Sequence, residues 1–248
     1  MRRILAAAVL AATVATVASC ASTPPPVPES VQKYYDENAN KISEPSPTRE
    51  PLTLKPVPAG AQVLFLGDSY TEGYGTTNMA KDNFARTLAR TRGWDAVVDG
   101  IGGTGFINGG PAGARDYRSR IENLSVERAL NPALVVIEGG LNDWESTTKA
   151  LWEAVEGTVK LARLKWPEAQ IVVIGPTAGS PENQSLTEGV GAVRNGANLA
   201  GVPFIDVSKL VTPVNDKALA FEDGYHLNTQ GHAAMAALID AEMAKLTS

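Results

Sequence analysis

Five short apolar runs alternate with helical patterns from Ala59 onward, and this alternation constrains the fold more than any other feature. Each run is continuous rather than alternating in polarity, as expected for strands that are buried on both faces. The runs are Gln62–Leu66, Ala96–Val98, Leu134–Ile137, Ile171–Ile174 and Val202–Val207. Such a β-α repetition predicts an α/β fold, a three-layer α/β/α sandwich around a doubly wound, mainly parallel sheet of about five strands.

Helical patterns fill the gaps between these runs. They cover Asn83–Thr91, Arg115–Ile121, Thr147–Lys165, Glu188–Leu199 and Thr229–Leu246. Asn228 stands directly before the last helix, where an asparagine side chain can cap the free amides of the first turn. Ligands of doubly wound sheets bind beyond the carboxyl ends of the strands. The residues that follow each run are therefore the ones to search for chemistry.

The first residues have the pattern of a signal sequence. Arg2 and Arg3 precede the apolar stretch Ile4–Ala18, which is too short and too weakly apolar for a spanning helix of about 20 residues. Its end, Val17-Ala18-Ser19-Cys20, resembles a bacterial lipobox. That resemblance implies that Cys20 becomes the first mature residue, carries a lipid, and anchors the protein to the outer side of the cell membrane. The alternative is a secreted protein with an incidental cysteine.

Three segments are expected from this organisation. Residues 1–19 form the signal peptide, residues 20–58 hold the lipidated cysteine and a proline-rich tether, and residues 59–248 form one folded domain. With 22 basic and 27 acidic residues, the net charge of −5 argues against nucleic acid as a partner. The single cysteine excludes a disulfide framework and a zinc site built mainly from thiolates. We expect a monomer.

The first run is followed by Gly67-Asp68-Ser69-Tyr70-Thr71-Glu72-Gly73. Ser69 lies where a strand passes into a helix, so that its hydroxyl would point into the site and its amide would lie near a helix N-terminus. The alternative is an ordinary turn serine. The chain has no Gly-x-Ser-x-Gly nucleophile elbow.

The second run is followed by a glycine-rich segment, Gly100-Ile101-Gly102-Gly103-Thr104-Gly105. Its spacing matches a dinucleotide fingerprint, but turn residues follow it where that fingerprint requires a helix. We therefore expect these glycines to let backbone amides approach a ligand closely. The stretch Phe106–Gly113 is expected to form a mobile rim over the pocket.

Two further segments carry candidate site residues. Gly140-Leu141-Asn142-Asp143 follows the third run and offers the neutral amide donor of Asn142, or else a turn residue. Near the C-terminus, Asp223 stands three residues before His226, where its carboxylate can bind Nδ1–H and leave Nε2 free as a base. The other histidine, His232, has no acidic partner at that spacing and is expected to be structural. Trp144 either lines the site or packs on the helix beyond.

Together, in this order, these segments resemble those of the SGNH hydrolases, the GDSL esterases and lipases, over about Val63–Leu246. The resemblance implies their flavodoxin-like fold, with Ser69 as nucleophile, His226 as its base and Asp223 orienting that base. It also implies an oxyanion hole made of the Ser69 amide, the Gly103 amide and the Asn142 side chain. This chain has Asp99 where the family usually has asparagine, and Gly102 is the alternative to Gly103 as donor.

The expected activity is hydrolysis of carboxylic esters through a covalent acyl-enzyme, without a metal or an organic cofactor. The expected substrates are short-chain acyl or O-acetyl groups on envelope glycans, or small esters. Two alternatives remain open at this point. One is transfer of the acyl group to a sugar hydroxyl by the same residues, and the other is a non-catalytic lipoprotein that binds glycans.

Overall fold

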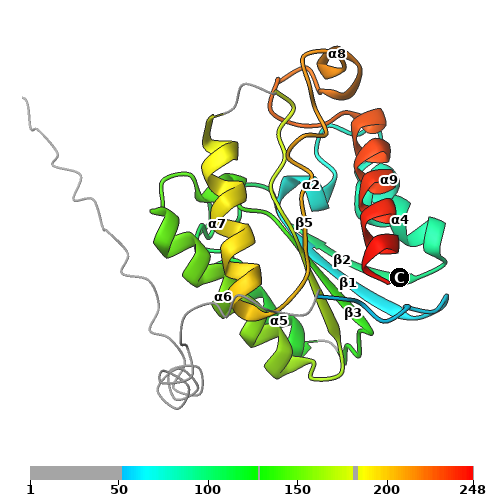
Figure 1. Cartoon of the computed structure of the whole chain (residues 1–248), viewed down its shortest axis with the longest axis vertical. Coiled ribbons are helices and arrows are strands. Elements are labelled where there is room, and N and C mark those ends of the chain that lie inside the picture. Colours follow the sequence, from blue (N-terminus) through cyan, green and yellow to red (C-terminus); the bar gives the residue numbers. More distant parts are fainter. Residues whose placement is uncertain (1–51, 128, 181–183, 248) are drawn as a thin grey trace, which may run out of the picture. The chain divides into compact units, whose positions relative to one another are not determined.

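The strands of the computed structural model form one parallel sheet in the order β2-β1-β3-β4-β5 (Figure 1). The model describes residues 52–127, 129–180 and 184–247. Its strands are β1 (Gln62–Gly67), β2 (Asp95–Gly100), β3 (Leu134–Glu138), β4 (Gln170–Ile174) and β5 (Phe204–Ile205). All the pairs in the ladder are parallel. The predicted α/β fold with a doubly wound parallel sheet is confirmed.

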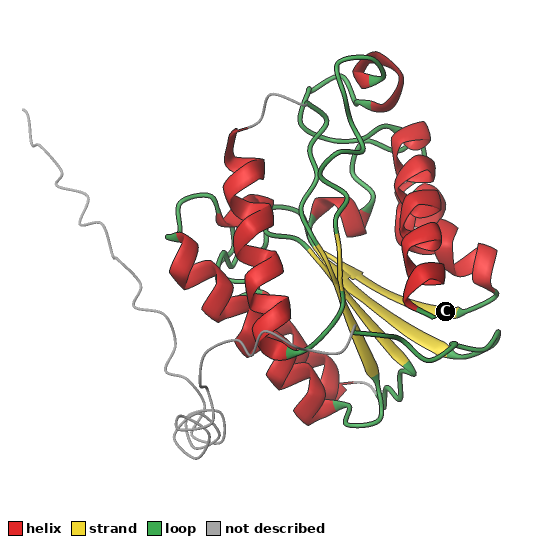
Figure 2. Cartoon of the chain, in the orientation of Figure 1, coloured by secondary structure: helices red, strands yellow, loops and turns green. Residues whose placement is uncertain are grey.

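Helices cover both faces of this sheet (Figure 2). α4 (Phe84–Arg92) and α9 (Thr229–Leu246) pack on one face, and α5 (Tyr117–Glu127), α6 (Thr148–Lys165) and α7 (Gln184–Ala200) pack on the other. Shorter helices lie in the loops: α2 (Ser69–Glu72), α3 (Met79–Asp82), the 3-10 turn η2 (Leu141–Asp143) and α8 (Asp216–Leu219). The sandwich therefore has the three layers that the sequence predicts.

The central strands are buried on both faces, as their continuous apolar runs predict. In β1, Val63 and Phe65 belong to the core beneath α4 and α9, while Leu64 and Leu66 are equally buried on the opposite face. Each such side chain contributes about 1.5–3 kcal/mol by leaving water. β2 lies at the edge of the sheet and is only half-buried.

Strand and helix limits differ from the sequence expectation where side chains bind the backbone. β5 contains two residues because the chain turns at Asp206, whose carboxylate accepts hydrogen bonds from the Ser208 amide and hydroxyl. α5 begins at Tyr117 because the Asp116 carboxylate accepts the first free amides of that helix. The Asn228 cap of α9 is confirmed, since its side chain accepts from the Gly231 amide.

The N-terminal part of the described chain joins the domain earlier than Ala59. Leu54 is buried, and its amide donates to the Leu246 carbonyl oxygen over 2.9 Å. Residues 52–58 are thus packed against the domain, although the sequence places them in the tether. The signal segment, Cys20 and the tether up to residue 51 lie outside the described residues.

The strand order creates one point where the connections from neighbouring strands run in opposite directions, between β1 and β3. A crevice forms at such a point beyond the carboxyl ends of the strands. The segments that leave β1 and β3 there contain Ser69 and Asn142. Within the described residues, the helices are too short or too polar to cross a membrane.

Candidate active site

Ser69 is the first residue of α2, immediately beyond the end of β1. Asp68 caps this helix, since its Oδ1 accepts from the Tyr70 amide over 2.9 Å. Gly73 ends the helix in the left-handed region at φ 99°. Because the turn is capped at both ends, Ser69 is fixed in place, and its side chain is 7% exposed.

The structure brings Ser69, His226 and Asp223 into one hydrogen-bonded chain. Ser69 Oγ lies 2.9 Å from His226 Nε2, across 157 residues of sequence, and His226 Nδ1 lies 2.7 Å from Asp223 Oδ2. Because a carboxylate can only accept, Nδ1 carries the hydrogen and Nε2 is left to accept from the Ser69 hydroxyl. This is the arrangement in which a serine is activated by a histidine base.

Asp223 is itself held in position by the turn that carries it. Its Oδ1 accepts from the amides of Tyr225 and His226, each over 2.9 Å. Partial burial acts to raise the pKa of Asp223, but the hydrogen bonds from the His226 amide and ring and from the Tyr225 amide outweigh it. The pKa is therefore lowered overall. Asp223 is thus an anion that orients the His226 ring across the neutral pH range.

Two aromatic rings pack against His226. The ring centroid of Tyr74 lies 4.6 Å from that of His226, and the centroid of Tyr70 lies 5.5 Å away. The Tyr70 hydroxyl also donates to the Tyr225 carbonyl oxygen over 2.5 Å. These contacts restrict the rotation of the histidine, so its geometry does not depend on Asp223 alone.

The two glycines that the sequence offers as amide donors differ in their surroundings. The Gly102 amide already donates to Glu72 Oε2 over 3.0 Å. Among the hydrogen bonds of the described residues, none uses the amide of Gly103 or of Ser69 as donor. A Cβ placed on Gly102 would lie 3.6 Å from Ser69 Cβ, so the glycine segment runs beside the serine. Gly103, at φ +74°, is therefore the better candidate.

Asn142 lies in η2 and points its amide group into the same region. Its Nδ2 donates to the Thr104 carbonyl oxygen over 2.9 Å and to Asp68 Oδ2 over 3.2 Å. An amide nitrogen has two hydrogens, so both have partners in this structure. A substrate oxyanion would have to displace one of them, and the longer bond, to Asp68, is the weaker of the two.

A buried arginine explains how the chain accommodates Asp99 in place of asparagine. Arg120 Nε lies 3.0 Å from Asp99 Oδ2, and its Nη1 donates to the Gly67 carbonyl oxygen and the Thr104 hydroxyl, each over 2.9 Å. The guanidinium therefore neutralises Asp99 and connects the ends of β1 and β2 to the glycine segment. No sequence pattern pointed to Arg120, because its partners are distant along the chain.

The rim segment after the glycines is bound to η2 rather than free. Asp143 accepts hydrogen bonds from the amides of Phe106, Ile107 and Asn108, over 2.9–3.0 Å. A buried carboxylate with three amide donors fixes this part of the loop. The first half of the expected mobile rim is therefore anchored beside Asn142.

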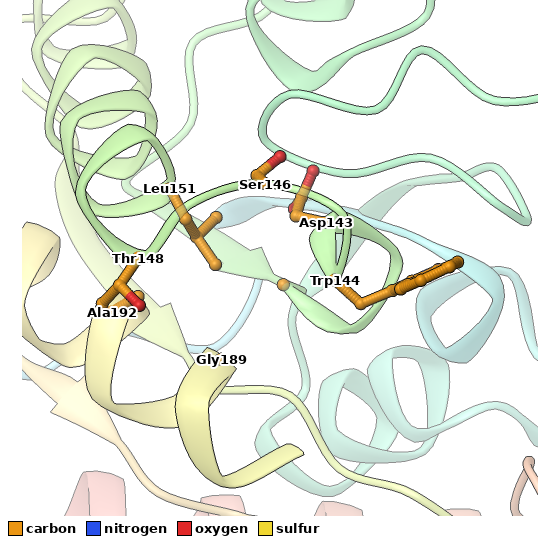
Figure 3. A pocket seen from close by; sticks show the side chains of 8 residues that line it. Asp143, Trp144, Ser146, Thr148, Leu151, Gly189 and Ala192 are labelled. Atoms are coloured by element: carbon orange, nitrogen blue, oxygen red, sulfur yellow. The ribbon is translucent and has the colours of Figure 1, made fainter. Parts of the chain in front are cut away.

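A small cavity lies between η2, the start of α6 and α7 (Figure 3). It encloses about 50 Å³, and Trp144, Leu151 and Gly189 are among its lining residues. Trp144 extends away from the helix residues Thr148 and Leu151 in Figure 3 and is 65% exposed, so it does not pack on α6. Neither Ser69 nor His226 lines this cavity.

A larger cavity of about 280 Å³ lies beside the glycine segment. Ser69 and His226 do not line it themselves, but Gly102, which lies next to Ser69, does. The other lining residues are Glu72, Ile101, Thr104, Gly109, Gly110, Pro111, Ala112 and Arg115. The cavity therefore offers room for part of a substrate close to the serine.

His232 has the structural role that the sequence indicated. It is fully buried, its Nδ1 accepts from the Phe84 amide over 3.3 Å, and its Nε2 lies 3.2 Å from the Tyr74 carbonyl oxygen. Burial lowers its pKa from 6.5 to about 4, so the ring is neutral. His232 links the loop after α2 to the start of α4.

The family assignment rests on a match over most of the domain. The model of the GDSL-like lipase/acylhydrolase family matches residues 65–234, a segment that begins in β1 and ends in α9. The chain belongs to this family. The GDSL-like acylhydrolases cleave ester bonds, so the protein is an ester hydrolase.

Solved structures share the fold of this GDSL-like protein at low sequence identity. An inhibitor-bound aryl esterase of M. smegmatis is 18% identical with a TM-score of 0.60, over 75% of this chain and 100% of that one. An acetylxylan esterase of Geobacillus stearothermophilus is 20% identical with a TM-score of 0.57, over 75% and 95%. A carbohydrate acetylesterase of Sinorhizobium meliloti is 18% identical with a TM-score of 0.57, over 75% and 99%. No curated protein matches the chain.

Several site residues of this GDSL-like hydrolase escape sequence reasoning. Glu72 binds the Gly102 amide, and Glu138, at the end of β3, accepts from the Thr71 hydroxyl over 2.8 Å. A charged residue ending a buried apolar strand was the available signal for Glu138. Within residues 52–127, 129–180 and 184–247, no group of three or more histidine, cysteine, aspartate or glutamate residues is arranged to hold a metal ion.

Proposed function

We propose that the protein is a serine esterase in which Ser69 attacks the ester carbonyl, His226 is the base and Asp223 orients it. The hydrogen-bonded chain from Ser69 Oγ through the His226 ring to Asp223 is the observation that carries this proposal. Ser69 directly follows β1, beside the point between β1 and β3 where the strand connections diverge and where ligands of such sheets bind.

The proposed reaction has two steps. His226 Nε2 takes the Ser69 proton as Oγ attacks, and the alcohol leaves with that proton, so that an acyl-Ser69 ester remains. Water then attacks this ester and gives a proton to His226, which passes it to Ser69 Oγ as the acyl–Oγ bond breaks and the acid is released. We assign the oxyanion to the amides of Ser69 and Gly103 and the side chain of Asn142. Each such preorganised donor stabilises the transition state by about 2.7–4 kcal/mol.

The proposed substrates are esters with a short acyl group, including O-acetyl groups on glycans. The cavity next to Gly102 is lined by three glycines, by the polar residues Glu72, Thr104 and Arg115, and by the apolar residues Ile101, Pro111 and Ala112. A volume of about 280 Å³ with charged residues in its wall suits a small, partly polar group better than a long acyl chain. Two structural neighbours named as esterases of acetylated carbohydrates are consistent with this choice.

Chain-length preference tests the proposed substrate class. We expect p-nitrophenyl acetate and butyrate to be hydrolysed at least about tenfold more efficiently than the palmitate ester, because a cavity of about 280 Å³ leaves most of a long chain in water. The measurement is kcat/KM across the series from acetate to palmitate. A preference for palmitate would contradict the short-chain assignment. Formation of an acylated sugar when a sugar acceptor is added would indicate a transferase.

We also propose that the enzyme acts outside the cytoplasm, held to the membrane by a lipid on Cys20. The support is the sequence Val17-Ala18-Ser19-Cys20 after an apolar segment, and the absence of another cysteine from the chain. A double acyl chain on one residue gives stable anchoring. The alternative is a secreted enzyme.

Fractionation of cells that express the full chain tests the anchor. We expect the wild-type protein in the membrane fraction with a lipid-modified N-terminal cysteine, visible by mass spectrometry. Cys20→Ser should remove the modification and shift the protein out of that fraction. An unmodified wild-type protein, found in the soluble fraction, would contradict the anchor and leave the esterase proposal intact.

A further inference from the structure

Two buried carboxyl groups lie beneath the oxyanion-hole residues. Asp68, between β1 and α2, and Glu138, the last residue of β3, are 0% and 1% exposed. Asp68 directly follows β1, which pairs with β3, the strand that ends at Glu138, and the two carboxyl groups are close enough for the charge of Asp68 to raise the pKa of Glu138. The reaction scheme above uses neither group directly.

The hydrogen-bond donors around this pair are unevenly distributed. Asp68 Oδ1 accepts from the Tyr70 amide over 2.9 Å, and its Oδ2 accepts from Asn142 Nδ2 over 3.2 Å. Glu138 Oε2 accepts from the Thr71 hydroxyl over 2.8 Å, but Glu138 Oε1 has no donor among the described residues. Two carboxylates cannot bind each other without a proton between them. A proton on Glu138 Oε1 would give this buried oxygen a partner, because it could then donate to Asp68.

The electrostatic surroundings favour this placement. Burial, followed by the charge of Asp68, raises the pKa of Glu138 well above its ordinary value. Asp68 also has a raised pKa, chiefly through burial. Charged and titratable groups face the pair from α2, α5 and η2, and they are Tyr70, Tyr117, Arg120 and Asp143. Arg120 favours an anion at Asp68, whereas Asp143 opposes it, so one of the two acids keeps its proton.

We propose that Glu138 is a positioning residue of the oxyanion hole. It is a neutral acid whose hydroxyl donates a hydrogen bond to Asp68, and Asp68 is the acceptor that orients the Asn142 side chain. This inference rests on the proposed esterase function. When Glu138 donates to Asp68, Asp68 still has a hydrogen-bond donor after Asn142 turns one hydrogen toward the substrate oxyanion. The turn of Asn142 then costs little free energy. Without that donor, Asp68 would compete with the oxyanion for the same hydrogen of Asn142.

Glutamine is the isostere of a protonated glutamate, and this gives a sharp test. In Glu138→Gln, Nε2 can donate to Asp68 while Oε1 accepts from the Thr71 hydroxyl, so we expect kcat within about threefold of wild type. Glu138→Leu removes the donor, and we expect kcat to fall about 10- to 100-fold with KM nearly unchanged. Tyr117→Phe is the matched control, because it removes a buried hydroxyl that has no hydrogen-bond partner among the described residues.

A measurement without substrate tests the protonation state separately. An ordinary glutamate ionises in the unfolded chain above about pH 4.5, so a Glu138 that stays protonated when folded costs the wild type stability as pH rises. Glu138→Gln lacks this cost. We therefore expect the denaturation midpoint of Glu138→Gln to rise relative to that of wild type between pH 5 and 8. The Tyr117→Phe difference from wild type should stay constant over this range.

Two outcomes would overturn the inference. One is a fall in kcat for Glu138→Gln as large as that for Glu138→Leu, which would mean that the charge of Glu138 is required. The other is a difference between the Glu138→Gln and wild-type midpoints that does not change with pH, which would mean that Glu138 is ionised in the fold. If Glu138→Leu fails to fold, the kcat of Glu138→Gln and the pH dependence of its denaturation midpoint test the inference without it. A wild-type protein that hydrolyses no ester would instead count against the proposed function.

Discussion

Ser69→Ala is expected to reduce kcat for ester hydrolysis by about 10⁵- to 10⁶-fold and to leave the protein folded. The hydroxyl is the proposed nucleophile, and no other side chain near His226 replaces it. The only hydrogen bond of Ser69 Oγ within the described residues is to His226. Removing the hydroxyl therefore lowers the free energy of unfolding only slightly. The measurement pairs single-turnover hydrolysis of p-nitrophenyl acetate with a chemical denaturation curve.

The matched control for this variant is Ser119→Ala. Ser119 lies in α5 and bonds to Asp116 rather than to the site. We expect its activity to equal that of wild type. A Ser69→Ala protein that keeps more than about one hundredth of the wild-type rate would mean that another group makes the acyl-enzyme, or that water attacks directly.

Asn142→Ala is expected to reduce kcat by about 10²- to 10³-fold, the loss seen when one oxyanion donor is removed. KM should change little, because the donor acts on charge that develops in the transition state. The variant also deprives the Thr104 carbonyl oxygen and Asp68 of a donor, which costs about 1–3 kcal/mol of stability. Steady-state kinetics and a denaturation curve measure both effects.

Asn131→Ala serves as the control for this second prediction. Asn131 is exposed and precedes β3, at the opposite end of the strand from Asn142. Its replacement should change neither kcat nor stability. An unchanged kcat in Asn142→Ala would contradict the assignment of its side chain to the oxyanion hole and would leave the two backbone amides as the donors.

The architecture of this domain was predictable because its signals are local and repeated. The central residues of β1, β3 and β4 are all apolar, and each strand ends at a turn or a charged residue. Asn228 could be placed as a cap because its position just before an apolar helix is itself a local pattern. β5 was overestimated because the Asp206 turn that shortens it depends on a side-chain contact rather than on hydropathy.

Some residues of the site were likewise indicated by local sequence patterns, and others were not. Ser69, Asn142 and His226 follow strands or precede a helix, so their neighbourhood in the sheet could be anticipated from the chain order. Arg120 and Glu138 could not be found in this way, since their partners are 21 and 67 residues away along the sequence. The structure also shows what no motif indicates, namely that the Gly102 amide is occupied by Glu72 and the Asn142 hydrogens by Thr104 and Asp68.

Covalent labelling of the purified protein with a fluorophosphonate tests the central claim most directly. The reagent reacts with a serine only when a base activates its hydroxyl, so it reports the Ser69–His226 pair without any assumption about the substrate. We predict one adduct per chain, located on the peptide that contains Ser69, and no adduct in Ser69→Ala or His226→Ala. A folded wild-type protein that takes up no label, or that is labelled at a residue other than Ser69, would contradict the account.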